Sequence, residues 1–320
     1  MTRTHYRNVA LAVLGTVAAG LGAAMFFYQH DIQRARERIT GGSRIAQTPC
    51  GPIEYAVAGD GPPVLMVHGA GGGFDQGLDI GAPLVERGFR VIAVSRFGYL
   101  RTPLPTDATP AAQADAHACL LDALGIRRVA VAGISAGAPS SLQFALRYPK
   151  RISALVLLVP AVYVPRPGGA APVTTPRGTT LLIDMGLRSD FLFWAASRLA
   201  RRTAITAILA TPPAVVETAS PEERARTLQV LEHILPITQR RLGLLNEAAV
   251  IPSLQRYELE RINVPTLTIS CADDLFGTYD GARYTAEQIP GARFVGYASG
   301  GHLWVGHHQD VAAELVRFLK

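Results

Sequence analysis

The sequence predicts an α/β fold: a doubly wound, mostly parallel sheet with an inserted helical lid and an N-terminal hydrophobic helix. Short apolar segments alternate with helical patterns, as they do in βαβ units. About a hundred mainly helical residues interrupt that alternation. The chain has 320 residues, which is long enough for one well-buried core with an insertion.

The expected strands are nearly continuous apolar runs, which is typical of a parallel sheet covered on both faces. Their expected ranges are residues 64–68, 90–95, 129–134, 154–159, 266–270 and 294–297. Helical patterns occupy residues 111–124, 139–148, 281–289 and 308–319. The first of these patterns ends before Gly125, a residue type that often follows a helix.

Residues 161–263 interrupt this order and are expected to form a lid. They begin with a Pro- and Gly-rich linker at 165–178, and helices are expected at 190–202, at 204–210 and from Ser220 onward. Ser220 is a suitable N-cap, with a proline and two glutamates in the following turn. The expected division is an N-terminal segment (1–44), a core (45–160 and 264–320) and the lid (161–263).

Residues 9–28 form an apolar run of 20 positions without a charged side chain. A helix of about that length spans a hydrocarbon core of about 30 Å, so we expect a membrane anchor followed by a basic juxtamembrane linker. A buried helix, or a cleaved signal peptide with secretion of the protein, is the alternative, although the bulky end at 25–28 does not suit cleavage. Arginines flank the run on both sides and leave the orientation undecided; we favour the extracytoplasmic side for the rest of the chain.

The net charge of +6 is concentrated at the N-terminus, where residues 1–44 hold six arginines and two acidic residues. Residues 45–320 carry 25 basic and 23 acidic side chains, so charge does not indicate a nucleic-acid partner. The three cysteines, Cys50, Cys119 and Cys271, are far apart. No two of them have the spacing of metal ligands, so no metal is expected. One disulfide between two of them stays open as an alternative.

The segment 133–137, with the sequence GISAG, directly follows an expected strand and precedes an expected helix. A sharp strand-to-helix turn at this point places the Ser135 hydroxyl at the carboxyl edge of the sheet, and the small flanking residues permit the turn. The sequence therefore predicts Ser135 as a nucleophile. A glycine-rich turn without a chemical role is the alternative.

A serine hydroxyl needs a base to react at neutral pH. The predicted base is His302, because it lies in a loop between the last expected strand and the last helix, from which it can return to the same sheet edge. His307 and His308 are the alternative bases. Asp273 and Asp274 follow the strand at 266–270, and either carboxylate can orient the imidazole.

Backbone N–H donors for a developing oxyanion are expected in two places. Ala136 directly follows Ser135, and the segment 68–73 (HGAGGG) follows the first expected strand, where its glycines let the backbone approach a bound oxygen. His68 is expected to hold this loop, whereas His117 is expected on a helix surface. A phosphate loop is the alternative for 68–73, but neither phosphate-loop pattern occurs there.

The motifs HGAGGG, GISAG, DD at 273–274 and GGH at 300–302 resemble, in type and chain order, those of the α/β-hydrolase superfamily, in particular its esterase, C–C hydrolase and cofactor-free haloperoxidase-like branch. The resemblance implies Asp274, which stands at the aspartate of the family's G-x-x-D pattern, rather than Asp273. It also implies Ala70 as the second oxyanion donor. The chain departs from the family at 95–98, where SRFG replaces the frequent D-x-x-G pattern.

The resemblance implies a serine hydrolase that cleaves an ester-like bond of a small, apolar substrate through an acyl-enzyme, with no cofactor. A serine nucleophile argues against dehalogenase and epoxide hydrolase activity. Gly69, Gly71 and Ile134 are expected to contact the substrate. A C–C bond hydrolase or a perhydrolase with the same triad is the alternative, and a non-catalytic ligand-binding homologue is an alternative of another class. The sequence does not define the oligomeric state. Apolar lid residues indicate a lipophilic substrate group or packing onto the core: Phe191, Leu192, Phe193, Trp194, Ile205, Ile208 and Leu209.

Overall fold

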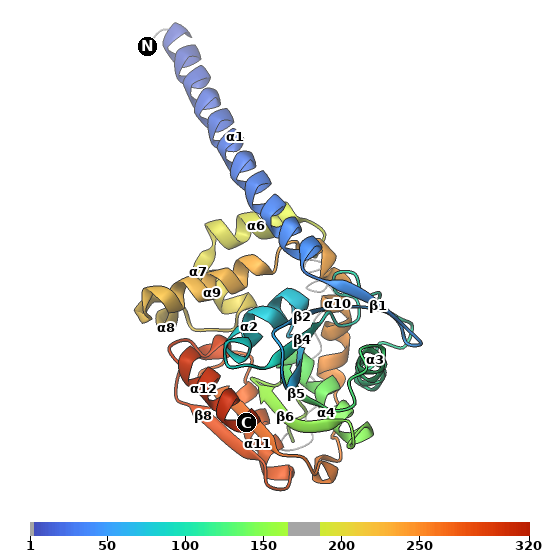
Figure 1. The fold of residues 1–320 in the computed structure, drawn as a ribbon. Helices are drawn as coiled ribbons and strands as arrows, with labels where there is room; N and C mark the ends of the chain where they lie inside the picture. Colours follow the sequence, from blue (N-terminus) through green and yellow to red (C-terminus); the bar gives the residue numbers. More distant parts are fainter. Residues whose placement is uncertain (1–2, 166–185) are drawn as a thin grey trace.

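An eight-stranded sheet lies at the centre of the computed structural model, which describes residues 3–165 and 186–320 (Figure 1). The strand order is β1-β2-β4-β3-β5-β6-β7-β8. From β4 to β8 neighbouring strands are parallel, whereas β1 and β2 form an antiparallel hairpin and β2 pairs antiparallel with β4. The strands are β1 (Arg44–Thr48), β2 (Gly51–Ala58), β3 (Pro63–Val67), β4 (Arg90–Val94), β5 (Val129–Ile134), β6 (Ile152–Leu158), β7 (Thr266–Cys271) and β8 (Arg293–Tyr297).

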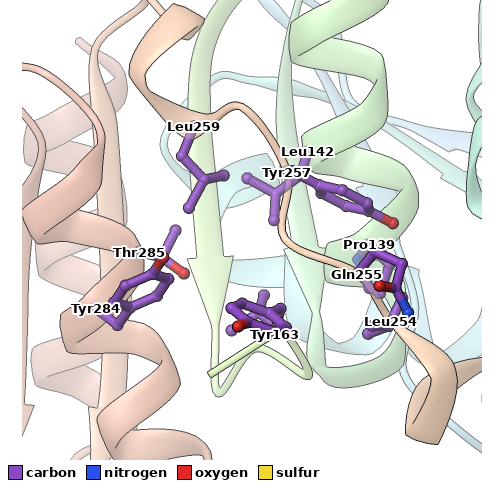
Figure 2. A pocket seen from close by; sticks show the side chains of 10 residues that line it. Pro139, Leu142, Tyr163, Leu254, Gln255, Tyr257, Leu259, Tyr284 and Thr285 are labelled. Carbon is purple, nitrogen blue, oxygen red and sulfur yellow. The ribbon is translucent and has the colours of Figure 1, made fainter. Parts of the chain in front are cut away.

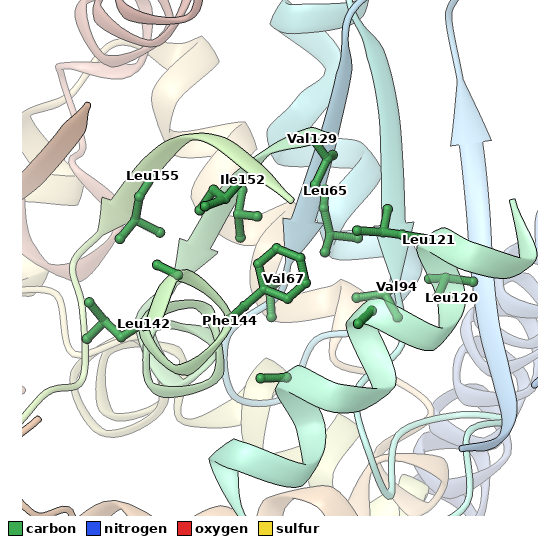
Figure 3. Packing of buried hydrophobic residues seen from close by; sticks show 14 of the residues in the cluster. Leu65, Val67, Val94, Leu120, Leu121, Val129, Leu142, Phe144, Ile152 and Leu155 are labelled. Carbon is green, nitrogen blue, oxygen red and sulfur yellow. The ribbon is translucent and has the colours of Figure 1, made fainter. Parts of the chain in front are cut away.

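Helices cover both faces of the sheet. Successive residues of a strand point to opposite faces, so neighbouring strand residues pack against different helices. On one face Leu65 and Val67 pack with α3 (Pro110–Ala123) and α4 (Ala138–Arg147), as Figure 3 shows. On the other face Val64 and Met66 pack with α2 (Phe74–Glu86) and α12 (His308–Leu319). Burial of both faces explains why these strands have continuous apolar sequences. The remaining helix of the core is α11 (Thr278–Gln288), which contacts β7 and β8.

The predicted fold with a mostly parallel sheet is confirmed, but helix α2 and the hairpin β1–β2 were not predicted. Helix α2 contains Gly77, Gly81 and Pro83, residue types that weaken helices. The two glycines allow α2 to lie close to the sheet. A Cβ at Gly77 would lie 2.8 Å from the Cβ of Ala93, and one at Gly81 would lie 2.9 Å from Cγ1 of Val91. Close packing therefore outweighs the low helix propensity of this segment.

The helices of the insertion follow β6 and precede β7. Ser220 caps α9 as predicted, because its hydroxyl accepts the Glu223 N–H at 3.3 Å. The helix predicted at 190–202 is wrong in its second part, since the helix ends at Leu199 and a new one begins at Arg201. The linker predicted at 165–178 lies outside the described residues except for its first residue. The helices are α6 (Asp190–Leu199), α7 (Arg201–Ile208), α8 (Pro213–Thr218), α9 (Pro221–His233) and α10 (Arg241–Val250).

Helix α1 (Arg3–Gly41) corrects the prediction of a membrane anchor at residues 9–28. Among the residues that the structure describes, no helix combines the length and the apolar character needed to cross a bilayer. The predicted membrane anchor, and the localisation derived from it, are wrong.

The last turns of α1 pack against the insertion instead of forming the predicted basic linker. Ile32 and Ala35 are buried against Trp194 of α6 and Leu235. The indole N–H of Trp194 donates to Asp31 at 2.8 Å. Figure 1 shows the first part of α1 extending away from the remainder of the fold. The C-terminal part of α1 therefore belongs to the folded unit and contacts the insertion.

Cys50, in the turn between β1 and β2, forms a disulfide with Cys119 of α3, 69 positions along the chain. Cys271, at the end of β7, is buried and free. The disulfide attaches the edge hairpin to a helix that covers the sheet. Sequence spacing alone does not identify such a pair, because the bond depends on the distance between the two residues in the fold.

Candidate active site

Ser135 lies in the sharp turn between β5 and α4. Strand β5 ends at Ile134, and a short 3₁₀ turn (Ser135–Gly137) leads directly into α4. The φ angle of Ser135 is +47°, a left-handed conformation that costs a non-glycine residue roughly 1–2 kcal/mol. The strand and the helix on either side hold this strained turn in place, as is common at functional sites. The hydroxyl is thereby presented beyond the carboxyl end of the sheet.

The structure brings Ser135, His302 and Asp274 together, although 167 positions separate Ser135 from His302. Nε2 of His302 lies 2.9 Å from Oγ of Ser135, and Nδ1 of the same ring lies 2.8 Å from Oδ2 of Asp274. All three side chains are buried. The ring of Phe276 contacts the imidazole edge-on, with 4.9 Å between centroids. A base oriented by a carboxylate therefore lies within hydrogen-bond reach of a hydroxyl.

The two neighbouring aspartates make different contacts. Asp274 accepts hydrogen bonds from the Phe276 N–H at 2.9 Å and from the Thr278 hydroxyl, in addition to its contact with His302. Asp273 accepts the backbone N–H groups of Gly300 and Gly301, at 3.2 and 2.7 Å. Asp273 therefore holds the loop that carries the imidazole, and Asp274 contacts the imidazole itself.

His307 and His117 have contacts other than Ser135. His307 stacks on Tyr297 and pairs with Asp310. His117, expected on a helix surface, is instead fully buried next to Ser140, and burial lowers the pKa of its imidazole to about 3. The helix α4 covers α3 at this point, so a pattern read from α3 alone places this residue wrongly.

A cavity of about 110 Å³ opens in front of Ser135 and His302, and its lining is mainly apolar. The residues predicted to contact the substrate line it, as does Ala70, one of the two predicted oxyanion donors: Gly69, Gly71 and Ile134 are the predicted contacts. Ala136, the other predicted donor, is buried directly after Ser135. From the apolar residues expected in the lid, Ile208 and Leu209 line the cavity, whereas Ile205 is buried within the insertion and Trp194 packs with α1.

Helix α9 supplies cavity residues that the sequence analysis missed. Arg226, Val230, His233 and Ile234, at the helix and its C-terminal end, all line the cavity. Their spacing of four, three and one residues places them on one helix face, so helical periodicity holds a signal for them. The sequence does not show that this face turns toward Ser135.

A second pocket, shown in Figure 2, lies on another part of the molecule. Its lining includes Tyr163, Tyr257 and Tyr284, and neither Ser135 nor His302 belongs to it. Its volume of about 10 Å³ is close to the space of one water molecule. It is therefore too small for an organic substrate.

A buried cluster of charges connects the glycine-rich segment 68–73, α1 and the insertion. Asp75 of α2 forms ion pairs with Arg240 and Arg38, at 2.7 and 3.2 Å. Arg240 also donates to the carbonyls of Gly72 and His233. Burial works to raise the pKa of the Asp75 carboxyl, but the two guanidinium groups outweigh it and lower this pKa to about 2. The carboxylate is therefore charged at neutral pH.

Among residues 3–165 and 186–320, no three His, Cys, Asp or Glu side chains gather into a group able to hold a metal ion. The polar groups around Ser135 are instead those of acyl-transfer chemistry: a hydroxyl, an imidazole, a carboxylate and a glycine-rich loop.

Comparison with known proteins agrees with the observed fold. The family model of the alpha/beta hydrolase fold matches residues 62–305. A solved structure, an alpha/beta hydrolase fold protein from Nakamurella multipartita, superposes with a TM-score of 0.66 at 27% identity, covering 87% of this chain and 98% of that protein. The likeness therefore extends over nearly all of the fold.

Two curated relatives match shorter segments. A hydrolase named YcgS from Bacillus subtilis is 39% identical over 107 residues, which cover 33% of this chain and 37% of that protein. A 2-hydroxy-6-oxo-6-phenylhexa-2,4-dienoate hydrolase from Comamonas testosteroni is 34% identical over 113 residues, which cover 34% of this chain and 40% of that protein. These matches span two fifths of the relatives or less, so they do not transfer a substrate.

Proposed function

Because the chain belongs to the α/β-hydrolase fold family, we propose that it is a serine hydrolase that cleaves an ester-like bond of a small, apolar substrate. The observation that supports this most directly is the hydrogen-bonded series from Ser135 through His302 to Asp274, with distances of 2.9 and 2.8 Å. The strained backbone of Ser135 adds support, because such strain is typical of a nucleophile held at a strand-to-helix turn.

The proposed reaction proceeds through an acyl-enzyme. Nε2 of His302 takes the proton of Ser135 as Oγ forms a bond to the substrate carbonyl carbon, and the carbonyl oxygen becomes an oxyanion. The N–H groups of Ala70 and Ala136 bind that oxygen. The imidazolium, stabilised by Asp274, then gives its proton to the leaving alcohol as the ester C–O bond breaks. Water, deprotonated by His302, releases the acid and restores Ser135.

The cavity supports an apolar substrate group. Its surface next to Ser135 is formed by aliphatic residues of the core and of the insertion, among them Ile134, Val159, Ile208 and Val230. Burial of an alkyl group there stabilises the complex by about 0.8 kcal/mol per methylene. We propose that residues 161–263 act as a lid on the core formed by 45–160 and 264–320, and that the lid selects the substrate.

Hydrolysis of p-nitrophenyl esters of increasing acyl length by the full-length protein tests this function. Ser135→Ala is expected to lower kcat by at least about 10⁴-fold, whereas Ser140→Ala, a change at a nearby buried serine that does not contact His302, leaves turnover near the wild-type rate. A fluorophosphonate probe is expected to label the wild type and not Ser135→Ala, since the probe reacts with an activated serine. Wild-type turnover in Ser135→Ala would refute the assignment.

A matched pair of substitutions tests the choice between the two aspartates. Asp274→Asn is expected to lower kcat by about 10⁴-fold, because the amide no longer stabilises the charged imidazole. Asp273→Asn keeps an acceptor for the Gly300 and Gly301 N–H groups, so a much smaller loss is expected. The reverse order of effects would assign the orienting role to Asp273.

Carbon–carbon bond hydrolysis is the second candidate, and the similarity to the dienoate hydrolase of Comamonas testosteroni favours it. Turnover of a ring-fission diketone with no turnover of esters would select it. Peracid formation from an ester and hydrogen peroxide would identify a perhydrolase. Failure of the fluorophosphonate to label the wild type would indicate a non-catalytic ligand-binding homologue.

A further inference from the structure

The carbonyl of Gly69 receives an unusual number of hydrogen-bond donors. The guanidinium Nη2 of Arg96 lies 3.1 Å from this oxygen, Nδ1 of His68 lies 2.7 Å from it, and the N–H of Gly72 donates to it at 3.2 Å. The backbone N–H of Arg96 donates to Nε2 of His68 at 3.0 Å. Nε2 is therefore the acceptor nitrogen, and Nδ1 carries the proton that is donated to Gly69.

This carbonyl shares its peptide group with the N–H of Ala70. In a planar trans peptide the C=O and N–H bonds point in opposite directions. Three donors on the carbonyl side therefore fix the direction of the Ala70 N–H on the other side, and Ala70 lines the cavity next to Ser135. A positively charged donor also polarises the peptide group and strengthens its N–H as a donor.

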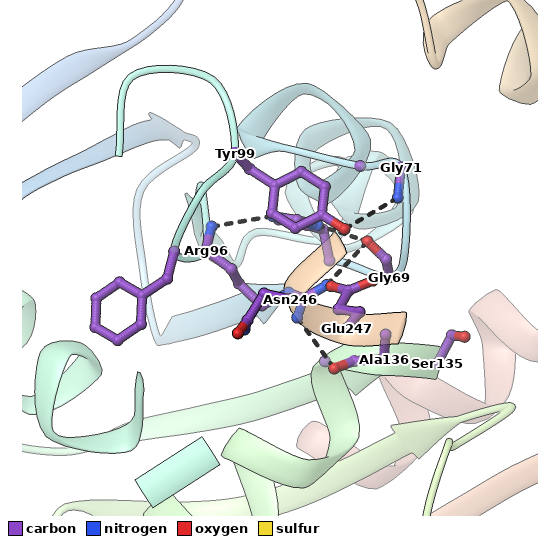
Figure 4. A network of polar contacts seen from close by, with 12 residues as sticks. Gly69, Gly71, Arg96, Tyr99, Ser135, Ala136, Asn246 and Glu247 are labelled. Carbon is purple, nitrogen blue, oxygen red and sulfur yellow. Dashed lines mark hydrogen bonds and ion pairs between the residues drawn. The ribbon is translucent and has the colours of Figure 1, made fainter. Parts of the chain in front are cut away.

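Arg96 is held for this contact from several directions. It is buried, it donates from Nη1 to the carbonyl of Ala136 at 3.1 Å, and its guanidinium lies over the ring of Tyr99 at 5.2 Å. Its counter-ion is Glu247 of α10, also buried. Figure 4 shows the guanidinium between Glu247 and the two loops that carry Gly69 and Ala136.

The insertion thus supplies the charge that keeps this arginine in place. Helix α10 can approach because residue 243 is a glycine: a Cβ there would lie 2.1 Å from the Tyr99 ring. The Tyr99 hydroxyl in turn accepts the N–H of Gly71 at 3.4 Å. The position of α10 and the conformation of the glycine-rich loop therefore depend on each other through Tyr99.

We propose that Arg96, held by Glu247 of the insertion, is a positioning residue that aims and polarises the Ala70 N–H toward the substrate oxyanion. The proposal rests on the proposed serine hydrolase function. It connects the insertion to the transition state as well as to substrate binding. It also assigns a role to the segment 95–98, where the chain departs from its family's frequent pattern.

The test separates positioning from stability with a double variant. Arg96→Met alone leaves Glu247 buried without a partner, which destabilises the fold. Arg96→Met combined with Glu247→Leu removes both charges, and replacing a buried ion pair by apolar groups is often neutral for stability. Arg101→Met is the matched control, because it breaks another ion pair with a buried partner, Glu54, whose carboxylate accepts hydrogen bonds from Ser43, Ser95 and Arg101.

In the full-length protein we expect the double variant to react with a fluorophosphonate about 10- to 100-fold more slowly than the wild type, less than the loss of a whole oxyanion donor. Its urea midpoint should lie near that of the wild type, and its kcat should fall with KM nearly unchanged. The affinity for a trifluoromethyl ketone, which forms an oxyanion on Ser135, should fall by the same factor as kcat. Arg101→Met should label at the wild-type rate, and Arg96→Lys should show partial recovery because it restores charge but not the two-armed geometry.

Wild-type labelling by the double variant would overturn the positioning role while the hydrolase function stands. An equal loss in Arg101→Met would also overturn it, since the effect would then be one of general stability. If the wild type is not labelled at all, the proposed function fails, and the positioning role fails with it.

Discussion

Replacing Asp75 by Asn tests whether the buried charge cluster contributes to stability through an ionised carboxylate. The pKa of Asp75 falls from 3.8 to about 2 in the folded chain because of Arg240 and Arg38. One pKa unit corresponds to about 1.4 kcal/mol. Ionised Asp75 therefore stabilises the folded state by about 2 kcal/mol relative to its protonated form.

The sign of the pH dependence follows from the direction of this change. The folded state binds the proton of Asp75 less readily than the unfolded state, so the contribution is fully present above about pH 5 and is mostly lost when the pH reaches about 2. Asp75→Asn carries no titrating group and lacks this contribution at every pH. The difference in unfolding free energy between wild type and variant should shrink by about 2 kcal/mol between pH 6 and pH 2.

Urea unfolding at a series of pH values, followed by the fluorescence of the buried Trp194 and Trp304, measures this difference. Comparing the two proteins at each pH cancels the other carboxylates and the histidines. Equal m-values for both proteins would show that the denatured states are comparable. A difference that stays constant from pH 6 to pH 2 would refute the assignment of an ionised, ion-paired Asp75.

Four further predictions concern the core, the disulfide, the insertion and the cavity. Burial lowers the pKa of His117 to about 3, so between pH 6 and 4 the unfolded state binds a proton at this residue and the folded state does not. The unfolding free energy should therefore fall by about 1.4 kcal/mol for each pH unit over this range. In His117→Leu this contribution to the pH dependence of the urea midpoint should be absent. Cys50→Ser should lower the unfolding free energy by about 2–4 kcal/mol with kcat unchanged, and equal stability of both proteins would contradict the bond. Gly243→Val should displace α10 from the Tyr99 ring, lower stability by roughly 1–3 kcal/mol and slow fluorophosphonate labelling; an unchanged labelling rate would argue against a connection between α10 and the oxyanion loop. Phe276→Ala should raise KM for apolar esters, since this side chain lines the cavity and contacts His302, whereas the exposed neighbour Leu275, which does not line it, should tolerate the same change.

Some features of this protein follow from neighbouring residues alone. The parallel strands have apolar runs because both of their faces are buried, and six of them were predicted close to their observed ranges. The turn at Ser135 follows from a strand, small flanking residues and a helix in immediate succession. These signals are local, and tertiary contacts strengthen them without redirecting them.

Other features depend on contacts between distant segments, which no local pattern encodes. Adjacent Asp273 and Asp274 have the same chemistry in the sequence. In the fold, Asp273 accepts the backbone N–H of Gly301, whereas Asp274 contacts the imidazole of His302, and this difference depends on the path of the loop before His302. His117 is buried because α4 lies over it, and helix α2 forms despite its glycines because they permit close packing on the sheet.

The apolar N-terminal run shows the same limit. Composition pointed to a membrane anchor, whereas the structure attaches the end of α1 to the insertion through Asp31 and Arg38. The sequence by itself determined the class of fold and the position of the sharp turn at Ser135, since both arise from short-range patterns. Tertiary structure alone decided which aspartate contacts His302, which helix face lines the cavity and which charged residues contact the glycine-rich segment 68–73, because each depends on packing between parts of the chain far apart in sequence.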